Sequence, residues 1–142
     1  MIGNKTGKLG EDIATLFLKG KGYVILHQNY WKPYGEIDIV CKKADKLHFI
    51  EVKAVLRSLD QFVYPKQASE TLNNVSHENI RPEDNVHSYK LKKLGWVIEV
   101  FLSENRFKNV DWQFDVCIVE IDKENKKARV EVLENQILEV RN

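Results

Sequence analysis

The 142-residue sequence has few of the features that mark secreted or membrane proteins. Its two cysteines, Cys41 and Cys117, each lie in an apolar run, which argues for buried reduced thiols and against a disulfide framework. The opening MIGNKTGKLGEDIA has no apolar signal core, and no run approaches the roughly 18 apolar residues that span a bilayer. These absences predict a soluble, cytoplasmic protein with no membrane partner.

The chain also lacks an excess of charge of either sign. Its 22 basic and 21 acidic residues give a formal net charge of +1, so composition alone does not indicate a nucleic-acid partner. A DNA-binding protein of this composition would have to concentrate positive charge locally. The length predicts a single domain spanning residues 1–142, and no internal repeat or low-complexity tract divides it.

Hydrophobic periodicity predicts seven elements. Residues 6–19 have helical spacing, with an expected buried stripe of Leu9, Ile13, Leu16 and Phe17. The other expected elements are a strand at 23–31, a hairpin within 35–53, a helix from Pro82 to about 104, and strands at 112–122 and 128–134. A long polar loop at about 57–81 separates the hairpin from the second helix.

The order of these elements predicts the fold class. A helix lies in the connection between the third and fourth strands, so these two strands should be parallel. The sequence therefore predicts an α/β domain, a mixed five-stranded sheet flanked by helices in the order α-β-β-β-α-β-β.

The hairpin GEIDIVCKKADKLHFIEVK carries charged residues inside two otherwise apolar strands. A four-residue loop at 43–46 and a tighter closure around Ala44-Asp45 give the same register. That register places Asp38 opposite Glu51 and Glu36 opposite Lys53. Alternation predicts one buried face, made by residues 37, 39, 41, 48, 50 and 52, with all four charged side chains on the other.

Two carboxylates on directly opposed strand positions need a proton or a cation between them. Their β-carbons would lie roughly 4.5–5.5 Å apart, where like charges are destabilising. Asp38, Glu51, a backbone carbonyl and waters would suit Mg²⁺, and Lys53 would project from the same face as Glu51. The chemistry indicated is phosphodiester hydrolysis. The alternative is a solvated face with a Glu36–Lys53 ion pair.

The combined motifs resemble a known family. Asp38, followed after twelve residues by Glu51-Val52-Lys53, is similar to the PD-(D/E)xK restriction-endonuclease-like superfamily. GKLGEDIATLFLKGKGYVILHQNY, GEIDIV, FIEVK and FDVCIVE together resemble the YraN-like family, which is expected to consist of endonucleases and has no settled biological role.

This resemblance implies roles for individual residues. Asp38, Glu51 and the Val52 carbonyl would be ligands of Mg²⁺, with Mn²⁺ as a substitute, and Lys53 the catalytic lysine. Glu11 would be an additional acid near the site, as in Holliday-junction resolvases of this fold, and Glu36 belongs to the same family string. The resemblance implies a DNA substrate, branched or flapped DNA included, and is compatible with a homodimer.

Two departures from the family pattern leave the substrate preference open. No basic residue directly follows Lys53, since the first arginine is Arg57, and the polar segment is longer than in many relatives.

Several further residues have two interpretations. On a helical wheel, Glu11 falls nearly opposite the stripe expected to be buried, which is typical of a solvated acid. His87 and Lys90 fall at the start of the second helix's apolar face, which continues through residues 94, 97, 98 and 101. They extend to the rim of the core or face the carboxylates, where Lys90 would pair with a phosphate. Asp115 opens a buried strand, and we expect its role to be structural.

Two other functions are compatible with this sequence. One is a non-catalytic nucleic-acid-binding module, and the other is a protein-interaction module that retains the nuclease fold. The weak net positive charge disfavours the first, because phosphate neutralisation drives such binding.

Overall fold

The structure, a computed structural model, describes residues 2–57 and 88–138. It contains seven elements: α1 (Ile2–Gly20), β1 (Val24–Lys32), β2 (Gly35–Lys43), β3 (Lys46–Leu56), α4 (Ser88–Glu104), β4 (Asp111–Asp122) and β5 (Lys127–Leu133). The predicted order of elements is confirmed. The predicted start of the second helix at Pro82, and the predicted polar loop after Arg57, lie outside the described residues.

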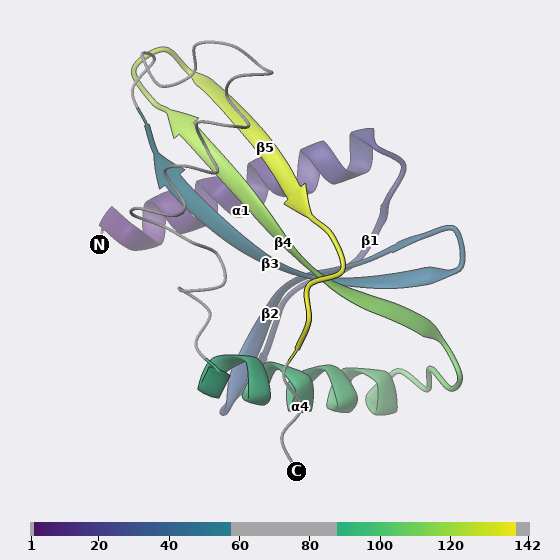
Figure 1. Ribbon diagram of the computed structural model, residues 1–142. Coiled ribbons are helices and arrows are strands. Elements are labelled where there is room, and N and C mark those ends of the chain that lie inside the picture. Colours follow the sequence, from purple (N-terminus) through teal and green to yellow (C-terminus); the bar gives the residue numbers. More distant parts are fainter. Residues whose placement is uncertain (1, 58–87, 139–142) are drawn as a thin grey trace.

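The five strands form one mixed sheet in which spatial order follows chain order, β1-β2-β3-β4-β5 (Figure 1). The β3–β4 pair is parallel, as the crossover predicted, and the other three pairs are antiparallel. Neither described helix is long and apolar enough to cross a membrane.

The β2–β3 hairpin has the predicted register, but its ladder is shorter than predicted. Lys42 pairs with Leu47, and the last pair is Ile39 with Ile50. Beyond that pair, the described part of β2 is paired with β1 alone and that of β3 with β4 alone. The predicted ladder positions for Asp38–Glu51 and Glu36–Lys53 are therefore wrong, because the two strands diverge before reaching them.

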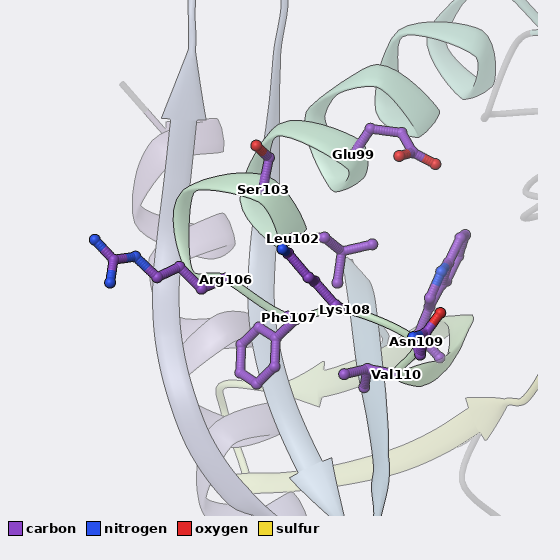
Figure 2. Close-up of a pocket in the computed structure, with 9 residues that line it drawn as sticks. Glu99, Leu102, Ser103, Arg106, Phe107, Lys108, Asn109 and Val110 are labelled. Atoms are coloured by element: carbon purple, nitrogen blue, oxygen red, sulfur yellow. The ribbon is translucent and has the colours of Figure 1, made fainter.

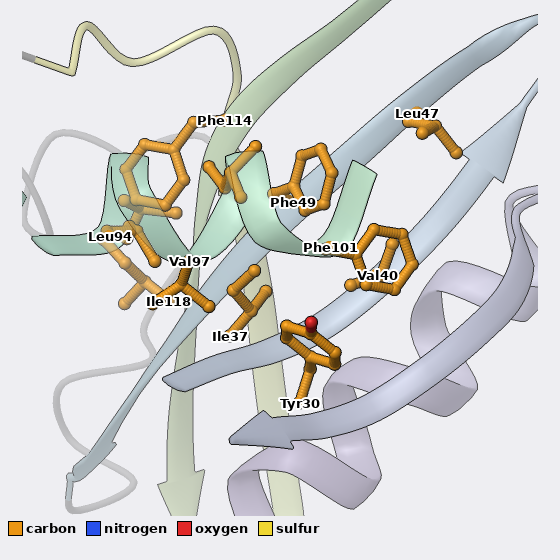
Figure 3. Close-up of a cluster of buried hydrophobic side chains, with 12 residues drawn as sticks. Tyr30, Ile37, Val40, Leu47, Phe49, Leu94, Val97, Phe101, Phe114 and Ile118 are labelled. Carbon is orange, nitrogen blue, oxygen red and sulfur yellow. The ribbon is translucent and has the colours of Figure 1, made fainter. Parts of the chain in front are cut away.

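A helix covers each face of the sheet, so both faces bury apolar side chains. Ala14 and Leu18 of α1 pack on a cluster that includes Ile39, Ile50 and Cys117. The opposite cluster packs against α4 (Figure 3). Its buried members are Tyr30, Ile37, Val40, Leu47, Phe49, Leu94, Val97, Ile98, Phe101, Phe114, Val116 and Ile118. The predicted apolar face of α4 is confirmed for residues 94, 97, 98 and 101.

The predicted alternation of β2 fails at a single position. Ile39 packs in the α1 cluster, whereas Ile37, two residues earlier, packs in the α4 cluster. In a regular strand these residues would share a face. The strand therefore rotates between them, at Asp38, and the prediction that residues 37 and 39 share one buried face is wrong.

The buried face of α1 also differs from the predicted stripe. The stripe is confirmed for Ile13 and Phe17, which pack against the cluster on the α1 side of the sheet. Leu9 and Leu16 are instead 37% and 70% exposed, while Gly10, Ala14 and Leu18 are buried. A β-carbon placed on Gly10 would lie 2.6 Å from the Ala54 β-carbon. Glycine therefore allows α1 to approach β3 closely, and this contact, more than leucine burial, sets the rotation of the helix.

We expect Gly10→Ala to destabilise the protein by about 1–3 kcal/mol, because the added methyl group overpacks the contact with Ala54. Gly7→Ala is the matched control, because nothing lies within 4 Å of its added methyl group. It should stabilise α1 by about 0.5–1 kcal/mol through helix propensity. Urea unfolding measures both, and equal midpoints for the two variants would contradict this account of the helix contact.

Candidate active site

Asp38 lies where β2 separates from β3. Its carboxylate forms a hydrogen bond to β3 at a position where the backbone pairing of the two strands has ended. Its Oδ2 accepts a hydrogen bond of 2.8 Å from the backbone N–H of Val52, the residue after Glu51. The side chain is consequently directed at β3. The loss of regular pairing thus brings a carboxyl group to a backbone amide that an ordinary β-strand partner would have satisfied.

The electrostatic environment of Asp38 opposes its ionisation. Burial, followed by the neighbouring charge of Glu51, raises the pKa of Asp38 to about 7, against the Val52 hydrogen bond, which lowers it. The charges of Glu11 and Glu36 raise it further. A cation placed beside Asp38 would relieve this repulsion and hold the carboxyl group in its charged form.

Glu51 and Lys53 lie on the same face of β3, as predicted from alternation. Glu51 is 6% exposed, and its Oε2 lies 3.7 Å from the Lys53 Nζ. The neighbouring Phe49 on that face belongs to the α4 cluster, whereas Ile50 and Val52 pack on the α1 side. Asp38, the buried Glu51 and the partly buried Lys53 thus gather just beyond the Ile39–Ile50 pair, where β2 and β3 separate. We call this point the fork.

Glu11 and Glu36 extend this group of acids from two other positions. Burial raises the pKa of Glu11, a hydrogen bond with Asn29 lowers it, and the charge of Glu36 raises it again. Glu11 is partly buried beside the Gly10 contact, so the solvated position expected from the helical wheel is corrected. Glu36 is exposed at the rim.

The donor set suits a hard divalent cation only in part. Among residues 2–57 and 88–138, no three histidine, cysteine or acidic side chains converge as a metal site. Asp38 and Glu51 would therefore supply two carboxylates, and backbone, water or substrate oxygens would complete the shell. Mg²⁺ is commonly bound in that way, through one or two carboxylates with substrate phosphates and water.

The remaining candidates divide into two groups. His87 lies outside the described residues, and Lys90 lies in α4 at a position whose side chain is not described. Asp115 is fully buried, and its carboxylate is bonded to neighbouring protein groups, as expected for a structural role. Its carboxylate accepts hydrogen bonds from Gln113 and from the Asn135 backbone, and its Oδ2 lies 2.7 Å from the His48 Nδ1.

A surface concavity of about 450 Å³ lies at the end of α4, lined by different residues (Figure 2). Its lining includes Leu102, Phe107, Val110 and Trp112, which pack against the α4 cluster, and Arg106 extends away from them. None of the acids at the fork lines this concavity.

The fold and the fork define an α/β protein with a mixed sheet and a carboxylate–lysine site, and comparison with known proteins gives its family. The family described as "Uncharacterised protein family UPF0102" matches residues 10–119, and the chain belongs to it. A UPF0102 protein of Dictyoglomus thermophilum is 34% identical, covering 95% of this chain and 98% of its own. A UPF0102 protein of Acetivibrio thermocellus is 33% identical, covering 96% and 94%.

The raised pKa of Asp38 predicts a pH-dependent penalty on stability. The folded protein holds a proton on this carboxyl group up to a pH of about 7, whereas the unfolded chain loses it near pH 4. The folded state therefore binds more protons across that window, and its stability falls as pH rises through it. Asp38→Asn, which cannot ionise, should be more stable than the unaltered protein at pH 8, by about 2–4 kcal/mol.

Chemical unfolding in the presence of a chelator, from pH 4 to pH 8, measures this difference, which should shrink towards pH 4. Asp12→Asn is the control, because Asp12 is exposed on the same helix as Glu11 and pairs with Lys8 at the surface. If the free energies of unfolding of the unaltered protein and of Asp38→Asn change with pH in the same way, the charged form of Asp38 is not destabilised at the fork, and the prediction is wrong.

Proposed function

We propose that this protein is a divalent-metal-dependent endonuclease that hydrolyses DNA phosphodiester bonds. The observation that supports it is the fork itself, where a buried Glu51, the repelled carboxyl group of Asp38 and the ammonium of Lys53 gather at the end of one ladder. Such a group of side chains is costly to maintain, and a structural role would be served as well by apolar residues.

In this proposal Asp38 and Glu51 hold Mg²⁺, or Mn²⁺ as its substitute, together with the backbone carbonyl of Val52. The ion would polarise the phosphoryl oxygen and lower the pKa of bound water. The chain's own contribution is the position of two carboxylates, fixed by the hydrogen bond to the Val52 amide and by the burial of Glu51. This arrangement resembles that of the PD-(D/E)xK superfamily.

Lys53 would act on the same phosphodiester from the face that it shares with Glu51. Its ammonium lies 3.7 Å from the Glu51 carboxylate. A metal ion bound by Glu51 would therefore lie close to the Lys53 ammonium, and both positive charges could contact the same phosphate group. Lys53 would orient the attacking water or stabilise the negative charge that builds up on the phosphoryl oxygens during its attack.

Branched or flapped DNA is the proposed substrate class, by resemblance to Holliday-junction resolvases. Glu11 would then be an additional acid at the site, and Glu36 an acid at its rim. Glu36, His87 and Lys90 stay weaker proposals for substrate contact. A homodimer is compatible with this function.

Cleavage of linear, flapped and four-way DNA, with Mg²⁺, Mn²⁺ or a chelator, tests the proposal. We expect metal-dependent cleavage that Asp38→Asn and Glu51→Gln abolish and Lys53→Met lowers by about 10²–10³-fold. Asp12→Asn, purified in the same way, should cleave like the unaltered protein, which controls for contaminating nuclease.

Equal cleavage by Asp38→Asn and the unaltered protein would refute this mechanism. DNA binding that is indifferent to Mg²⁺ and gives no turnover would instead identify a nucleic-acid-binding module. Recovery of a protein partner and no nucleic acid would identify an interaction domain.

A further inference from the structure

Trp31 of β1 is a large aromatic residue that the fold leaves exposed at the edge of the sheet. It is 65% exposed, and in the described part of the chain its strand is paired with β2 alone. A single exposed apolar residue is ordinary on a protein surface, so exposure by itself assigns no role. The contacts of its neighbours in the strand and the residue opposite it in the ladder are more informative.

The two neighbours of Trp31 in the strand are anchored on the α4 side of the sheet. Tyr30 packs in the cluster beneath α4 (Figure 3), and its hydroxyl donates a hydrogen bond to the Glu104 carboxylate of α4. The Lys32 Nζ lies 2.8 Å from the other oxygen of that carboxylate. Because successive side chains of a strand point to opposite faces, Trp31 projects away from α4. One glutamate thus holds both flanks of Trp31 and sets the face that it occupies.

Trp31 pairs directly with Glu36 in the β1–β2 ladder. The preceding pair, Tyr30 with Ile37, lies in the cluster beneath α4, so Trp31 and Glu36 share the other face. Directly opposed residues have β-carbons roughly 4.5–5.5 Å apart. Both Trp31 and Glu36 are exposed. A flat aromatic ring and a carboxylate that accepts hydrogen bonds therefore lie side by side at the surface.

This pair lies at the rim of the candidate site. Glu36 precedes Asp38 by two residues in β2, roughly 7 Å along the strand. Glu36 and the acids at the fork would repel a phosphate at this position, whereas a nucleobase carries no charge. Aromatic side chains stack on bases of any kind, and carboxylates accept hydrogen bonds from the amino group of cytosine. The chemistry of the pair therefore suits a nucleobase better than a phosphate.

We infer that Trp31 and Glu36 form a binding site for one unpaired nucleobase of the DNA, close to the bond that is cut. This inference rests on the proposed function for the identity of the ligand. Trp31 supplies the stacking surface, and Glu36 accepts a hydrogen bond from the amino group of cytosine or adenine. Bases inside a duplex are stacked and paired with one another, so only an unpaired base fits. The site directs the protein to single-stranded or flapped segments.

Binding of labelled single-stranded DNA, followed by fluorescence anisotropy at one salt concentration, gives the first test. Chelator in the buffer prevents metal-dependent cleavage during the titration. We expect Trp31→Ala to weaken binding by about 10-fold, and Trp31→Phe, which keeps an aromatic ring, to restore most of the affinity. Trp96→Ala is the matched control and should bind like the unaltered protein, because Trp96 is 53% exposed but lies on α4.

Tryptophan emission in the same titrations gives a direct signature of stacking. DNA should quench the emission of the unaltered protein and of Trp96→Phe, but that of Trp31→Phe much less. Equal quenching in the two phenylalanine variants would overturn the inference. So would equal affinities of Trp31→Ala and the unaltered protein, or the absence of single-stranded DNA binding by the unaltered protein.

Base preference tests the part played by Glu36. The unaltered protein should bind strands of cytosine about 5-fold more tightly than strands of thymine, because thymine presents an acceptor where cytosine has its amino group. Glu36→Gln should remove this preference, since an amide both donates and accepts hydrogen bonds. Glu99→Gln, which neutralises an exposed acid on α4, controls for charge and should keep it. A preference that Glu36→Gln leaves unchanged would overturn the role of Glu36.

Cleavage assays separate failure of this inference from failure of the proposed function. The result expected from both is cleavage of flapped DNA with a KM that Trp31→Ala raises by about 10-fold, and an unchanged KM for linear duplex. If the protein cleaves flapped DNA and Trp31→Ala has the same KM, the inference fails and the proposed function stands. If no metal-dependent cleavage occurs but binding of single strands depends on Trp31, the proposed function fails and the base site stands.

Discussion

The hydrogen bond from the Val52 amide to the Asp38 carboxylate is the interaction on which the candidate site depends. It closes the β2–β3 ladder at the point where the two strands separate, and it does so with a side chain instead of a backbone carbonyl. Strand separation leaves amide groups to be satisfied, and a carboxylate can satisfy one while keeping lone pairs for another partner. The separation of the two strands therefore leaves an amide unpaired, and the acid that satisfies this amide is the one at the candidate site.

The arrangement of acids at the fork is destabilising, and contacts elsewhere in the fold offset that loss of stability. Several acids share a small, partly buried region, and burial and mutual repulsion both disfavour their charged forms. The surrounding structure keeps them in place through contacts that do not depend on charge. These are the close approach of Gly10 to Ala54 and the apolar clusters on both faces of the sheet. Functional sites commonly keep such unfavourable arrangements at the expense of stability.

Sequence reasoning gave the elements and the strand pairing because periodicity and connection length report them directly. The parallel β3–β4 pair and the hairpin register were predicted correctly. The point of divergence was not, because nothing in GEIDIV marks where pairing stops. The buried face of the first helix was predicted only in part: Ile13 and Phe17 do pack on the sheet, but Leu9 and Leu16 are exposed, and the small residues Gly10 and Ala14 lie against the sheet. Alternation rules assume regular strands, so they failed at Asp38, the residue of greatest interest.

The order of the strands has a consequence for how the chain acquires its structure. Since spatial order equals chain order, three of the four strand pairings join strands that are adjacent in sequence with short connections. Only the β3–β4 pairing must close a large loop, from Leu56 to Asp111. The entropy of closing a loop grows only logarithmically, by about 0.6 kcal/mol for each doubling of its length. A change in the length of that connection therefore carries little thermodynamic penalty, whereas non-local pairings of this kind are associated with slower folding than local ones.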